Sequence, residues 1–521
     1  MIENENTWQK VIDEGNAEEF HKKFDNAVTE LKNELGKDYP MIINGNKIFS
    51  DKVFQIISPS DDSAIIAKFP KATIEQTTEA IEAAKKAFTE WSTTNYQTRV
   101  KIFKKVADEF SNKKFKLAAI MSFENGKNRL ESIGEIDETI DFLRYYAYEL
   151  ERNEGFCRKT KNVISNEKTQ SVLKPYGIWG IISPFNFPSA IAIGMTTGVL
   201  ITGNTAVLKP ASAAPLSAYY FVEMIHEKLP TGTINFVTGS GNIAGKTIVE
   251  SPLVDGLAFT GSHEVGLSSF RKFTQITPKP VISEMGGKNP TIVTETADLE
   301  KATDGVMRAA FGYSGQKCSA CSRVYVQKDI AKKFIEKLID KTKKLKIGMP
   351  WEKDVFLGPI INVDAIKKYE RATQLAKQDG KILYGGHVLT ELEYQKGNFV
   401  EPTIVTNLSE NHELIKEELF LPFLCIQEYE DFDEALKNAN NVKYGLTAGI
   451  FSKDKAKIDK FFNSIEAGVT YVNRATSATT AALPQSQPFV GWKGSGISGK
   501  GAGGPYYLQQ FMREQTQTIC D

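Results

Sequence analysis

The chain has 521 residues, of which 41% are hydrophobic, so it can bury a large core and is long enough for two or more domains. Its 64 basic and 64 acidic residues give a formal net charge of zero, which excludes bulk electrostatic attraction to nucleic acid or to an anionic membrane. The five cysteines are spread thinly, unlike a secreted disulfide framework, and fit a reducing cytoplasm. The polar start Met1-Ile-Glu-Asn-Glu-Asn lacks the apolar segment of a signal peptide.

Helices and one hairpin are expected in the first 152 residues. After the polar start the pattern is helical, and Met41-Ile-Ile-Asn-Gly-Asn-Lys-Ile-Phe49 then predicts a hairpin that turns at Asn44-Gly45. Thr73 and Gln76 form a candidate capping box. Apolar residues follow it at helical spacing, at positions 81, 84, 88 and 91. Helices are expected to continue to about residue 152.

A polar, strand-like segment at 157–170 leads into two sections of alternating strands and helices, 172–290 and about 291–480. Such alternation predicts parallel sheets. No charged residue stands between Lys174 and Lys209, but prolines and glycines interrupt the run, whereas a membrane-spanning helix needs about 20 continuous apolar residues. We expect a buried strand at 178–182 and an interior helix at 188–202.

Three glycine clusters compete as the phosphate-binding site. Gly494-Ser-Gly-Ile-Ser-Gly499 matches the G-x-G-x-x-G pattern, but no predicted strand precedes it and more glycines follow in place of a helix, so we expect a loop. Residues 239–245 and residues 261–266 each follow a predicted strand and open a helix, where free N–H groups could bind a pyrophosphate. Spacing alone favours neither of these two.

The stretch Phe311-Gly-Tyr-Ser-Gly-Gln-Lys-Cys-Ser-Ala-Cys-Ser-Arg323 places Cys318 directly after a lysine among small residues. The thiolate is the nucleophilic form of cysteine, and we expect the ammonium group of Lys317 to stabilise it. In Ser283-Glu-Met-Gly-Gly-Lys288, Glu284 ends an apolar segment beside a glycine pair, as a general base could. A lone cysteine is more often a core residue and a lone glutamate is usually solvated or paired, so their joint occurrence is what indicates an enzyme.

These two segments resemble those of the aldehyde dehydrogenase superfamily, in which Gly-Gln-x-Cys carries the nucleophile and Glu-x-Gly-Gly-Lys carries the base. The resemblance covers most of the chain in matching order and spacing. It includes Pro184-Phe-Asn-Phe-Pro188, Leu208-Lys-Pro-Ala211 and Phe259-Thr-Gly-Ser262, which are similar to the oxyanion, adenosine-ribose and pyrophosphate segments. Three further segments resemble the delta-1-pyrroline-5-carboxylate dehydrogenase branch: Glu34-Leu-Gly-Lys-Asp-Tyr-Pro-Met-Ile-Ile43, Cys318-Ser-Ala-Cys-Ser-Arg323 and Ala502-Gly-Gly-Pro-Tyr-Tyr-Leu508.

The resemblance implies oxidation of an aldehyde to a carboxylic acid with NAD or NADP, through a thiohemiacetal and a thioester on Cys318. Glu284 is then the base, and the side chain of Asn186 and the backbone amide of Cys318 stabilise the oxyanion. The residues that it assigns to the cofactor are Ser183, Phe185, Lys209, Ser212, Gly261, Ser262, Gly266, Glu418 and Phe420. The residues that it assigns to the substrate, expected to be glutamate-gamma-semialdehyde, are Phe187, Ser319, Phe489, Gly503 and Gly504. Residues 239–245 are left as the packing of a helix start.

The implied fold is α/β, with a Rossmann-like cofactor-binding domain, an α/β catalytic domain and a small β oligomerisation element. Its expected parts are a helical extension at 1–38, the cofactor-binding domain at 39–152 and 173–290, the catalytic domain at 291–485, and an oligomerisation hairpin and tail at 153–172 and 503–521. We therefore expect a cytoplasmic homo-oligomer, a dimer or larger, that acts on a small-molecule aldehyde and binds neither nucleic acid nor membrane.

Three positions depart from the family pattern. Leu421 and Val490 stand where glycine is usual, and if those glycines adopt positive φ or allow close backbone approach, the bulkier residues require a local shift. Ser212 stands where NAD-preferring relatives commonly have a glutamate, whose carboxylate repels a 2′-phosphate. With that charge absent and Lys209 nearby, we expect NADP to be tolerated or preferred. The alternative is a serine that makes one ribose hydrogen bond to NAD.

Other functions remain open on the sequence alone. Cys318 and Cys321 form a C-x-x-C pair, which is found in thiol-disulfide oxidoreductases and zinc sites. No second pair exists and the histidines are scattered, so we expect no metal site, while a reversible bond between these two cysteines stays open. The alternatives are an NADP-dependent dehydrogenase of glyceraldehyde, succinate semialdehyde or 2-oxoglutarate semialdehyde, a cysteine thioester hydrolase, and a non-enzymatic structural protein.

Overall fold

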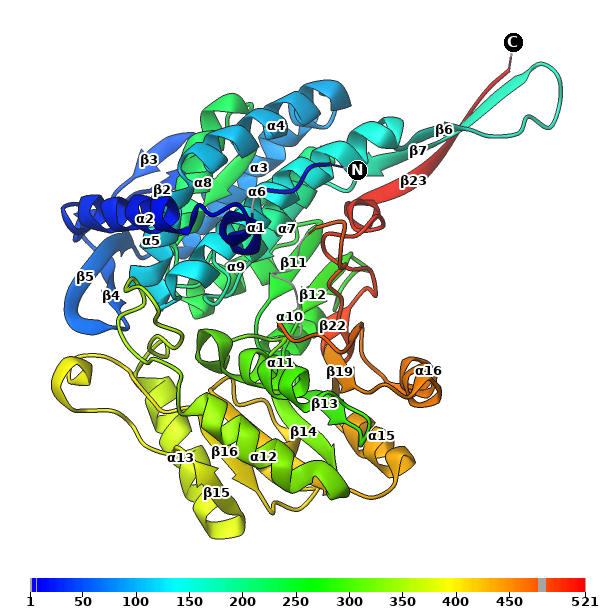
Figure 1. Cartoon of the computed structure of the whole chain (residues 1–521). Helices are drawn as coiled ribbons and strands as arrows, with labels where there is room; N and C mark the ends of the chain where they lie inside the picture. Colours follow the sequence, from blue (N-terminus) through cyan, green and yellow to red (C-terminus); the bar gives the residue numbers. More distant parts are fainter. Residues whose placement is uncertain (1, 6, 477–483, 521) are drawn as a thin grey trace.

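Two sheet-centred bodies and a protruding arm make up the computed structural model, which describes residues 2–5, 7–476 and 484–520. Figure 1 shows the first body in blue to green, the second in green to orange, and the arm extending to the C-terminus. The sheet of the first body contains strands from the N-terminal part of the chain and one strand from near the C-terminus. This body is therefore built from segments that are not continuous in the sequence.

An eight-stranded sheet lies at the centre of the first body, in the order β22-β12-β11-β8-β9-β10-β2-β3. Its strands are β2 Met41–Ile43, β3 Asn46–Ile48, β8 Ile178–Ile182, β9 Thr205–Lys209, β10 Ile234–Phe236, β11 Gly256–Thr260, β12 Val281–Glu284 and β22 Gly496–Ile497. The five strands from β12 to β10 pair in parallel, which confirms the prediction for residues 172–290. The hairpin is also confirmed, because β2 pairs antiparallel with β3 and both Asn44 and Gly45 adopt positive φ.

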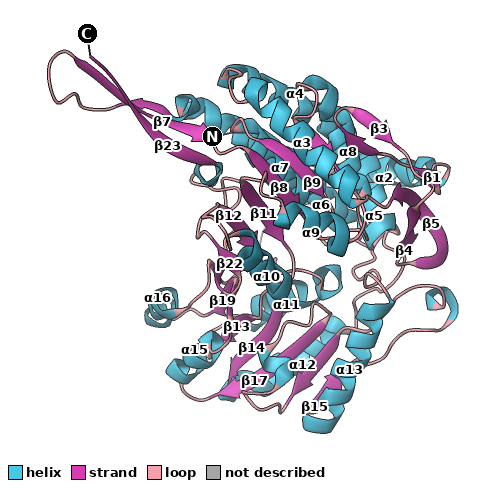
Figure 2. Cartoon of the chain, turned by 180° about the vertical axis from the view of Figure 1, so that it is seen from behind, coloured by secondary structure: helices cyan, strands magenta, loops and turns pink. Residues whose placement is uncertain are grey.

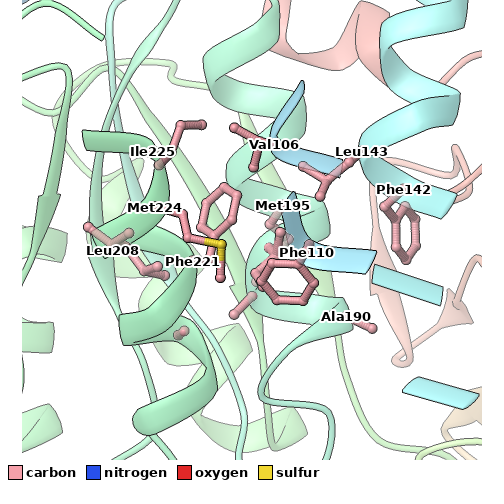
Figure 3. Close-up of a cluster of buried hydrophobic side chains, with 14 of the residues drawn as sticks. Val106, Phe110, Phe142, Leu143, Ala190, Met195, Leu208, Phe221, Met224 and Ile225 are labelled. Carbon is pink, nitrogen blue, oxygen red and sulfur yellow. The ribbon is translucent and has the colours of Figure 1, made fainter. Parts of the chain in front are cut away.

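Helices cover this sheet and supply most of its core. They are α1 Trp8–Asp13, α2 Ala17–Lys32, α3 Ile74–Trp91, α4 Tyr96–Asn112, α5 Lys114–Asn125, α6 Arg129–Arg152, α7 Ala190–Ile201, α8 Leu216–Ile225, α9 Lys246–Glu250 and α10 His263–Phe273. The capping box of Thr73 and Gln76 is present at the start of α3. In Figure 3, side chains from α4, α6, α7 and α8 meet in one cluster, among them Val106, Leu143 and Phe221. A smaller sheet joins β1 Lys37–Asp38, β4 Val53–Ser58 and β5 Asp61–Pro70.

The uncharged run between Lys174 and Lys209 forms a strand, a loop and a helix, as predicted. Both β8 and α7 are almost entirely buried inside the first body. Among the described residues, none of the helices has the length and apolar character needed to cross a bilayer.

A seven-stranded sheet forms the second body, in the order β15-β16-β17-β14-β13-β19-β20. Its strands are β13 Asn289–Val293, β14 Cys321–Gln327, β15 Lys381–Tyr384, β16 Thr403–Thr406, β17 Phe423–Tyr429, β19 Thr447–Phe451 and β20 Val469–Val472. Its helices are α11 Leu299–Phe311, α12 Lys328–Thr342, α13 Val363–Asp379, α14 Glu413–Lys416, α15 Phe432–Asn440 and α16 Lys455–Ser464. Beside it, β18 Tyr444–Gly445 pairs with β21 Trp492–Lys493.

The arm is an antiparallel sheet of β6 Cys157–Lys159, β7 Glu167–Pro175 and β23 Met512–Cys520, and it projects away from both bodies (Figure 2). It joins the two segments that the sequence grouped as hairpin and tail. The segment just before β23 is not part of the arm. Its residues Tyr507, Leu508 and Phe511 are buried in the core of the first body.

The prediction that residues 494–499 form a loop was wrong in part. Gly496 and Ile497 form β22, which pairs antiparallel with Glu284 and Ser283 at the edge of the eight-stranded sheet. A two-residue strand that pairs with a segment more than 200 positions away leaves no periodic signal in the sequence.

Candidate active site

Cys318 follows a strained turn that links α11 to β14. Tyr313 and Ser314 adopt φ of 51° and 50°, and Gly315 follows at 69°. Non-glycine residues rarely occupy this left-handed region. Two bonds hold the turn: the Tyr313 hydroxyl donates to the carbonyl of Asn125 at 3.0 Å, and the Ser314 hydroxyl donates to that of Gly358 at 2.6 Å. The loop that presents Cys318 is therefore fixed from both bodies.

Asn186, the predicted oxyanion donor, lies beside this loop. Its Nδ2 donates to the backbone carbonyl of Gln316 at 3.0 Å, two residues before Cys318, and the side chain is only 3% exposed. The carboxamide has two N–H groups, so this bond orients the amide and leaves a second donor for an oxygen near the sulfur. The Oε1 of Gln316 in turn accepts from the backbone N–H of Ile361 at 2.9 Å.

The thiol of Cys318 is neutral in this environment. Burial raises its pKa to about 12, and the carboxyl groups of Glu418 and Glu284 raise it further. The backbone N–H groups of Ser319 and of Cys318 itself act in the opposite direction. Both acids therefore lie close enough to influence the sulfur.

The expectation that Lys317 stabilises the thiolate was wrong. Its Nζ forms an ion pair with Glu131 on α6, at 2.6 Å from Oε1. Neighbours in sequence need not face the same partner, and here the ammonium group turns to an acid from the other body.

Glu284 is the last residue of β12. Burial raises the pKa of its carboxyl group well above the usual value, and a hydrogen bond from the backbone N–H of Gly491 opposes this only in part. Its Oε2 is buried and has no hydrogen-bond partner among the described residues. An unpartnered carboxyl oxygen beside a thiol is free to accept a proton from a water molecule.

The glycine pair that follows Glu284 lets three groups come together. A Cβ on Gly286 would overlap with the carboxylate of Glu418, and one on Gly287 would lie 2.5 Å from the carbonyl oxygen of Cys318. The backbone N–H of Gly287 donates to Oε1 of Glu418 at 2.8 Å. Burial raises the pKa of Glu418 to about 7, so its charge responds to small changes near neutral pH.

The residues assigned to the adenosine end of a dinucleotide gather where β9 ends. Lys209 is 4% exposed, its Nζ donates to the carbonyl of Pro210 at 2.9 Å, and burial lowers its pKa to about 8. The hydroxyl of Ser212 donates to the carbonyl of Gly239 at 2.8 Å. Gly245 also lies beside the side chain of Lys209, so the cluster at 239–245 adjoins this region.

The residues assigned to the pyrophosphate and the nicotinamide lie next to the candidate base. Ser262 is the N-cap of α10, and Gly261 donates its N–H to the carbonyl of Glu284 at 3.2 Å. A Cβ on Gly266 would lie 2.5 Å from the sulfur of Met285. The buried hydroxyl of Ser183 has no partner among the described residues. A helix start with free N–H groups and an unsatisfied hydroxyl fit a bound dinucleotide.

Aromatic residues line the same region. Leu421 and Val490, the two residues that stand where glycine is usual, have no backbone strain there. The rings of Phe185 and Phe420 pack edge to face, 5.8 Å apart. Among the residues with described φ, neither Leu421 nor Val490 has a positive value, whereas Phe420 does, at 61°. The backbone of this turn therefore places its left-handed residue one position before Leu421.

The predicted substrate residues differ in their surroundings. Phe187 is half-buried, with the ammonium group of Lys127 3.4 Å from its ring centroid, and Ser319 directly follows the nucleophile. The N–H of Gly503 donates to the hydroxyl of Tyr146 at 3.0 Å, and that of Gly504 donates to Gly501 at 3.1 Å. Both N–H groups already donate hydrogen bonds within the protein, so they are not free to bind a substrate carboxylate as predicted.

Phe489 forms an isolated bridge with Ala502 and is half-buried. Residues 477–483, which precede it, lie outside the described part of the chain.

Sequence reasoning missed a buried charged pair behind the oxyanion segment. Lys127 and Glu135 are both fully buried and form an ion pair, and Glu135 accepts hydrogen bonds from the N–H groups of Ser189 and Ala190 at the start of α7. This arrangement fixes the segment that follows Asn186. Acidic residues at 131, 135 and 138, at the spacing of one helix face, were the available signal.

The second cysteine of the C-x-x-C pair has a structural position. Cys321 is 2% exposed and lies 3.2 Å from the hydroxyl of Thr291, and all five cysteines are free thiols. Within the described ranges, no three His, Cys, Asp or Glu side chains are grouped in a way that could hold a metal ion.

Comparison with known proteins identifies close relatives over the whole length. The Aldehyde dehydrogenase family model matches residues 48–517. The chain is 37% identical over 507 residues to a 1-pyrroline-5-carboxylate dehydrogenase of Geobacillus sp. (strain WCH70), covering 96% of each protein. A 1-pyrroline-5-carboxylate dehydrogenase from Thermus, solved with bound NAD, has a TM-score of 0.93 and 32% identity, covering 100% of this chain and 99% of that one. Proline utilization A from Bdellovibrio bacteriovorus has the same TM-score at 34% identity, but this chain spans only 53% of it.

The raised pKa of Cys318 predicts how the protein without cofactor reacts with iodoacetamide. Because only the thiolate is alkylated, the rate at Cys318 should rise about tenfold per pH unit between pH 7 and 10, without a plateau. Mass spectrometry of the peptide that contains Cys318 separates it from the other cysteines. A plateau below pH 9 would show that a cation does stabilise the thiolate.

Proposed function

Because the chain belongs to the aldehyde dehydrogenase family, we propose that it oxidises glutamate-gamma-semialdehyde, the open form of 1-pyrroline-5-carboxylate, to glutamate with NAD or NADP. The observation that carries the chemistry is the meeting of Cys318, Asn186 and Glu284 in one place. The substrate rests on the relatives that bear this name and on the sequence segments typical of that branch.

The thiol of Cys318 releases its proton to solvent water as the sulfur attacks the aldehyde carbon, and a tetrahedral thiohemiacetal anion forms. The free N–H of Asn186 and the backbone N–H of Cys318 bind the oxyanion as its charge develops. One such donor contributes about 3 to 4 kcal/mol to the transition state. Because Asn186 is already oriented by Gln316, little reorganisation is needed when the charge forms.

A bound dinucleotide would supply the hydride acceptor and positive charge near the sulfur. Loss of the hydride leaves a thioester on Cys318. The residues placed to hold the cofactor are Lys209 and Ser212 at the adenosine end, Ser262 at the start of α10, and Glu418 near the reacting carbon. Glu418 stays within reach because Gly286 has no side chain.

Hydrolysis of the thioester then uses Glu284. Its unpartnered Oε2 takes a proton from water, and the resulting hydroxide attacks the thioester carbon. The acid leaves, and the sulfur recovers a proton. Since the pKa of Glu284 is raised, more of it is ionised as pH rises, and hydrolysis should quicken in the same direction.

The substrate site needs an anchor for the far carboxylate and a wall for the carbon chain. Phe187 and Phe489 are proposed as the wall, and the hydroxyl of Ser319 as one contact to the carboxylate. Since the N–H groups of Gly503 and Gly504 are engaged, these two residues are proposed to shape the site rather than to bind the anion directly.

Assembly and location are also proposed. The arm of β6, β7 and β23 projects away from both bodies (Figure 2) and has exposed apolar residues, including Ile519 on β23 and Val163 in the loop between β6 and β7. It is proposed to pair with other copies of the chain in a homo-oligomer. Five free thiols support a reducing compartment such as the cytoplasm.

Glu284→Gln should trap the thioester. The amide cannot accept a proton from water, so the acyl group should accumulate on Cys318 and be seen as a mass increase after mixing with aldehyde and cofactor, while steady-state turnover falls by about 10²- to 10⁴-fold. Cys318→Ala is the control, because it should bind the dinucleotide without gaining mass. Full turnover by the Gln variant would remove Glu284 from the mechanism.

A panel of aldehydes tests the substrate. The kcat/KM for glutamate-gamma-semialdehyde should exceed that for propanal, glyceraldehyde and succinate semialdehyde by about 10²-fold or more, since a site that pairs with a carboxylate loses that pairing with the others or meets it at the wrong distance. A preference for one of the other aldehydes would overturn the substrate and leave the dehydrogenase activity standing.

Ser212→Glu tests the cofactor preference. A carboxylate at this position should repel a 2′-phosphate, so the KM for NADP should rise about tenfold or more while that for NAD changes little. In the unmodified protein, the advantage of NADP should also weaken as pH rises through about 8, where Lys209 loses its proton. Equal effects on both cofactors would show that position 212 does not contact the 2′ group.

A further inference from the structure

The glycine-rich segment that matches G-x-G-x-x-G has a structural role beside Glu284. Residues 491–497, called here the 491–497 turn, run from β21 into β22 and fold back tightly on themselves. A Cβ on Gly491 would overlap with the carbonyl oxygen of Ser495, and one on Gly496 would lie 2.5 Å from that of Gly491. The backbone is thus close-packed on itself, which accounts for glycine at positions 491 and 496 without a phosphate.

Three hydrogen bonds link Ser495, at the centre of this turn, to residues outside the turn, and Ser495 is fully buried. Its hydroxyl donates to the carbonyl of Gly286 at 2.7 Å and accepts from the N–H of Gly445 at 3.0 Å. Its backbone carbonyl accepts from the N–H of Met285 at 2.7 Å. Two of these partners are the residues that directly follow Glu284.

The same turn also contacts Glu284 itself. Gly491 donates its N–H to the carboxyl group, and Gly496 pairs with Glu284 in the sheet. Because Gly491 packs on the carbonyl of Ser495, a shift of Ser495 would move the donor that holds the carboxyl group.

The turn connects both bodies. Gly494 accepts a hydrogen bond at its carbonyl from the ring of His263 in α10, at 2.7 Å, and donates its N–H to Lys443 at 2.8 Å. The hydroxyl of Ser495 links the same two parts of the protein, since it bonds to Gly286 in the segment after β12 and to Gly445 in β18.

We propose that Ser495 is a positioning residue for hydrolysis of the thioester: its hydroxyl holds Gly286 and Gly445, and through them and the 491–497 turn it keeps Glu284 directed at Cys318. The inference rests on the proposed role of Glu284 as the base. In Ser495→Ala, the carbonyl of Gly286 and the N–H of Gly445 lose their partner inside the protein. The carboxyl group then samples positions from which water is activated poorly.

A double-mutant cycle tests this without aldehyde or cofactor. 4-Nitrophenyl acetate acylates Cys318 with release of 4-nitrophenol, and the decay of the acyl group, followed by mass, reports hydrolysis alone. Ser495→Ala should slow this decay by about 10-fold or more. Added to Glu284→Gln, it should slow the decay by less than about 2-fold, because the group on which it acts is already absent.

Ser452→Ala is the matched control. Ser452 is also fully buried, and its hydroxyl accepts hydrogen bonds from the hydroxyl of Thr294 at 2.9 Å and from the N–H of Asp454 at 3.1 Å. These three residues do not belong to the proposed site. It should leave the decay within about 2-fold of the unmodified protein. If Ser495→Ala does not fold, Ser495→Cys, whose thiol is a weaker donor and acceptor in the same place, enters the same cycle.

The outcomes separate this inference from the function on which it rests. Decay at the unmodified rate in Glu284→Gln would overturn the role of Glu284, and Ser495 as its positioning residue with it. Slow decay in Glu284→Gln with normal decay in the Ser495 variant would overturn the inference alone. An equal slowing by the Ser495 variant in both backgrounds would also overturn it, since Ser495 would then act independently of Glu284.

Discussion

The active site exists because two adjacent residues have no Cβ. Gly286 and Gly287 stand between the base and the second sheet, and the carboxylate of Glu418 and the backbone of Cys318 occupy the space that side chains would fill. The bodies that carry the proposed nucleophile, base and cofactor residues can therefore meet at van der Waals distance. Any side chain at either position would separate groups whose chemistry depends on distances of about 3 Å.

Close approach has an electrostatic cost. Cys318, Glu284 and Glu418 lie close together and are each partly buried, so burial favours the neutral form of each, and the pKa of all three is raised. The carboxyl groups of Glu284 and Glu418 ionise at a lower pH in the unfolded chain than in the folded protein. Their contribution to stability is therefore present below the unfolded pKa and is lost as pH rises toward the folded pKa. At neutral pH the site destabilises the fold, and the surrounding core must offset it.

Because the thiol of Cys318 is neutral, it needs a further source of stabilisation before it can react as a thiolate. Lys317 is the nearest cation in sequence, yet it is paired with Glu131 and does not face the sulfur. The thiolate must then gain its stabilisation from the backbone N–H groups of Cys318 and Ser319 and from charge that arrives with the ligand. A nucleophile that ionises more readily in the assembled complex reacts more slowly in the free enzyme, which limits wasteful reactions.

Local signals in the sequence were sufficient for much of the fold. The hairpin at Asn44, the capping box at Thr73 and the buried run that forms β8 and α7 each depend on contacts between residues near one another in the chain. The candidate nucleophile, base and oxyanion donor could also be named, because each lies in a short segment with a recognisable pattern. The structure places all three at one site.

What the sequence could not reveal are contacts between distant segments. The pairing of β22 with β12, the ion pair of Lys317 and the engaged N–H of Gly503 each depend on a partner at least 150 positions away. The same limit applies to Leu421, whose bulk suggested strain at a usual glycine position. The backbone instead places its positive φ at Phe420, whose ring packs on Phe185. Strain in this turn thus coincides with an aromatic contact that can compensate for it, and the side chain of Leu421 is free to pack in the core of the second body.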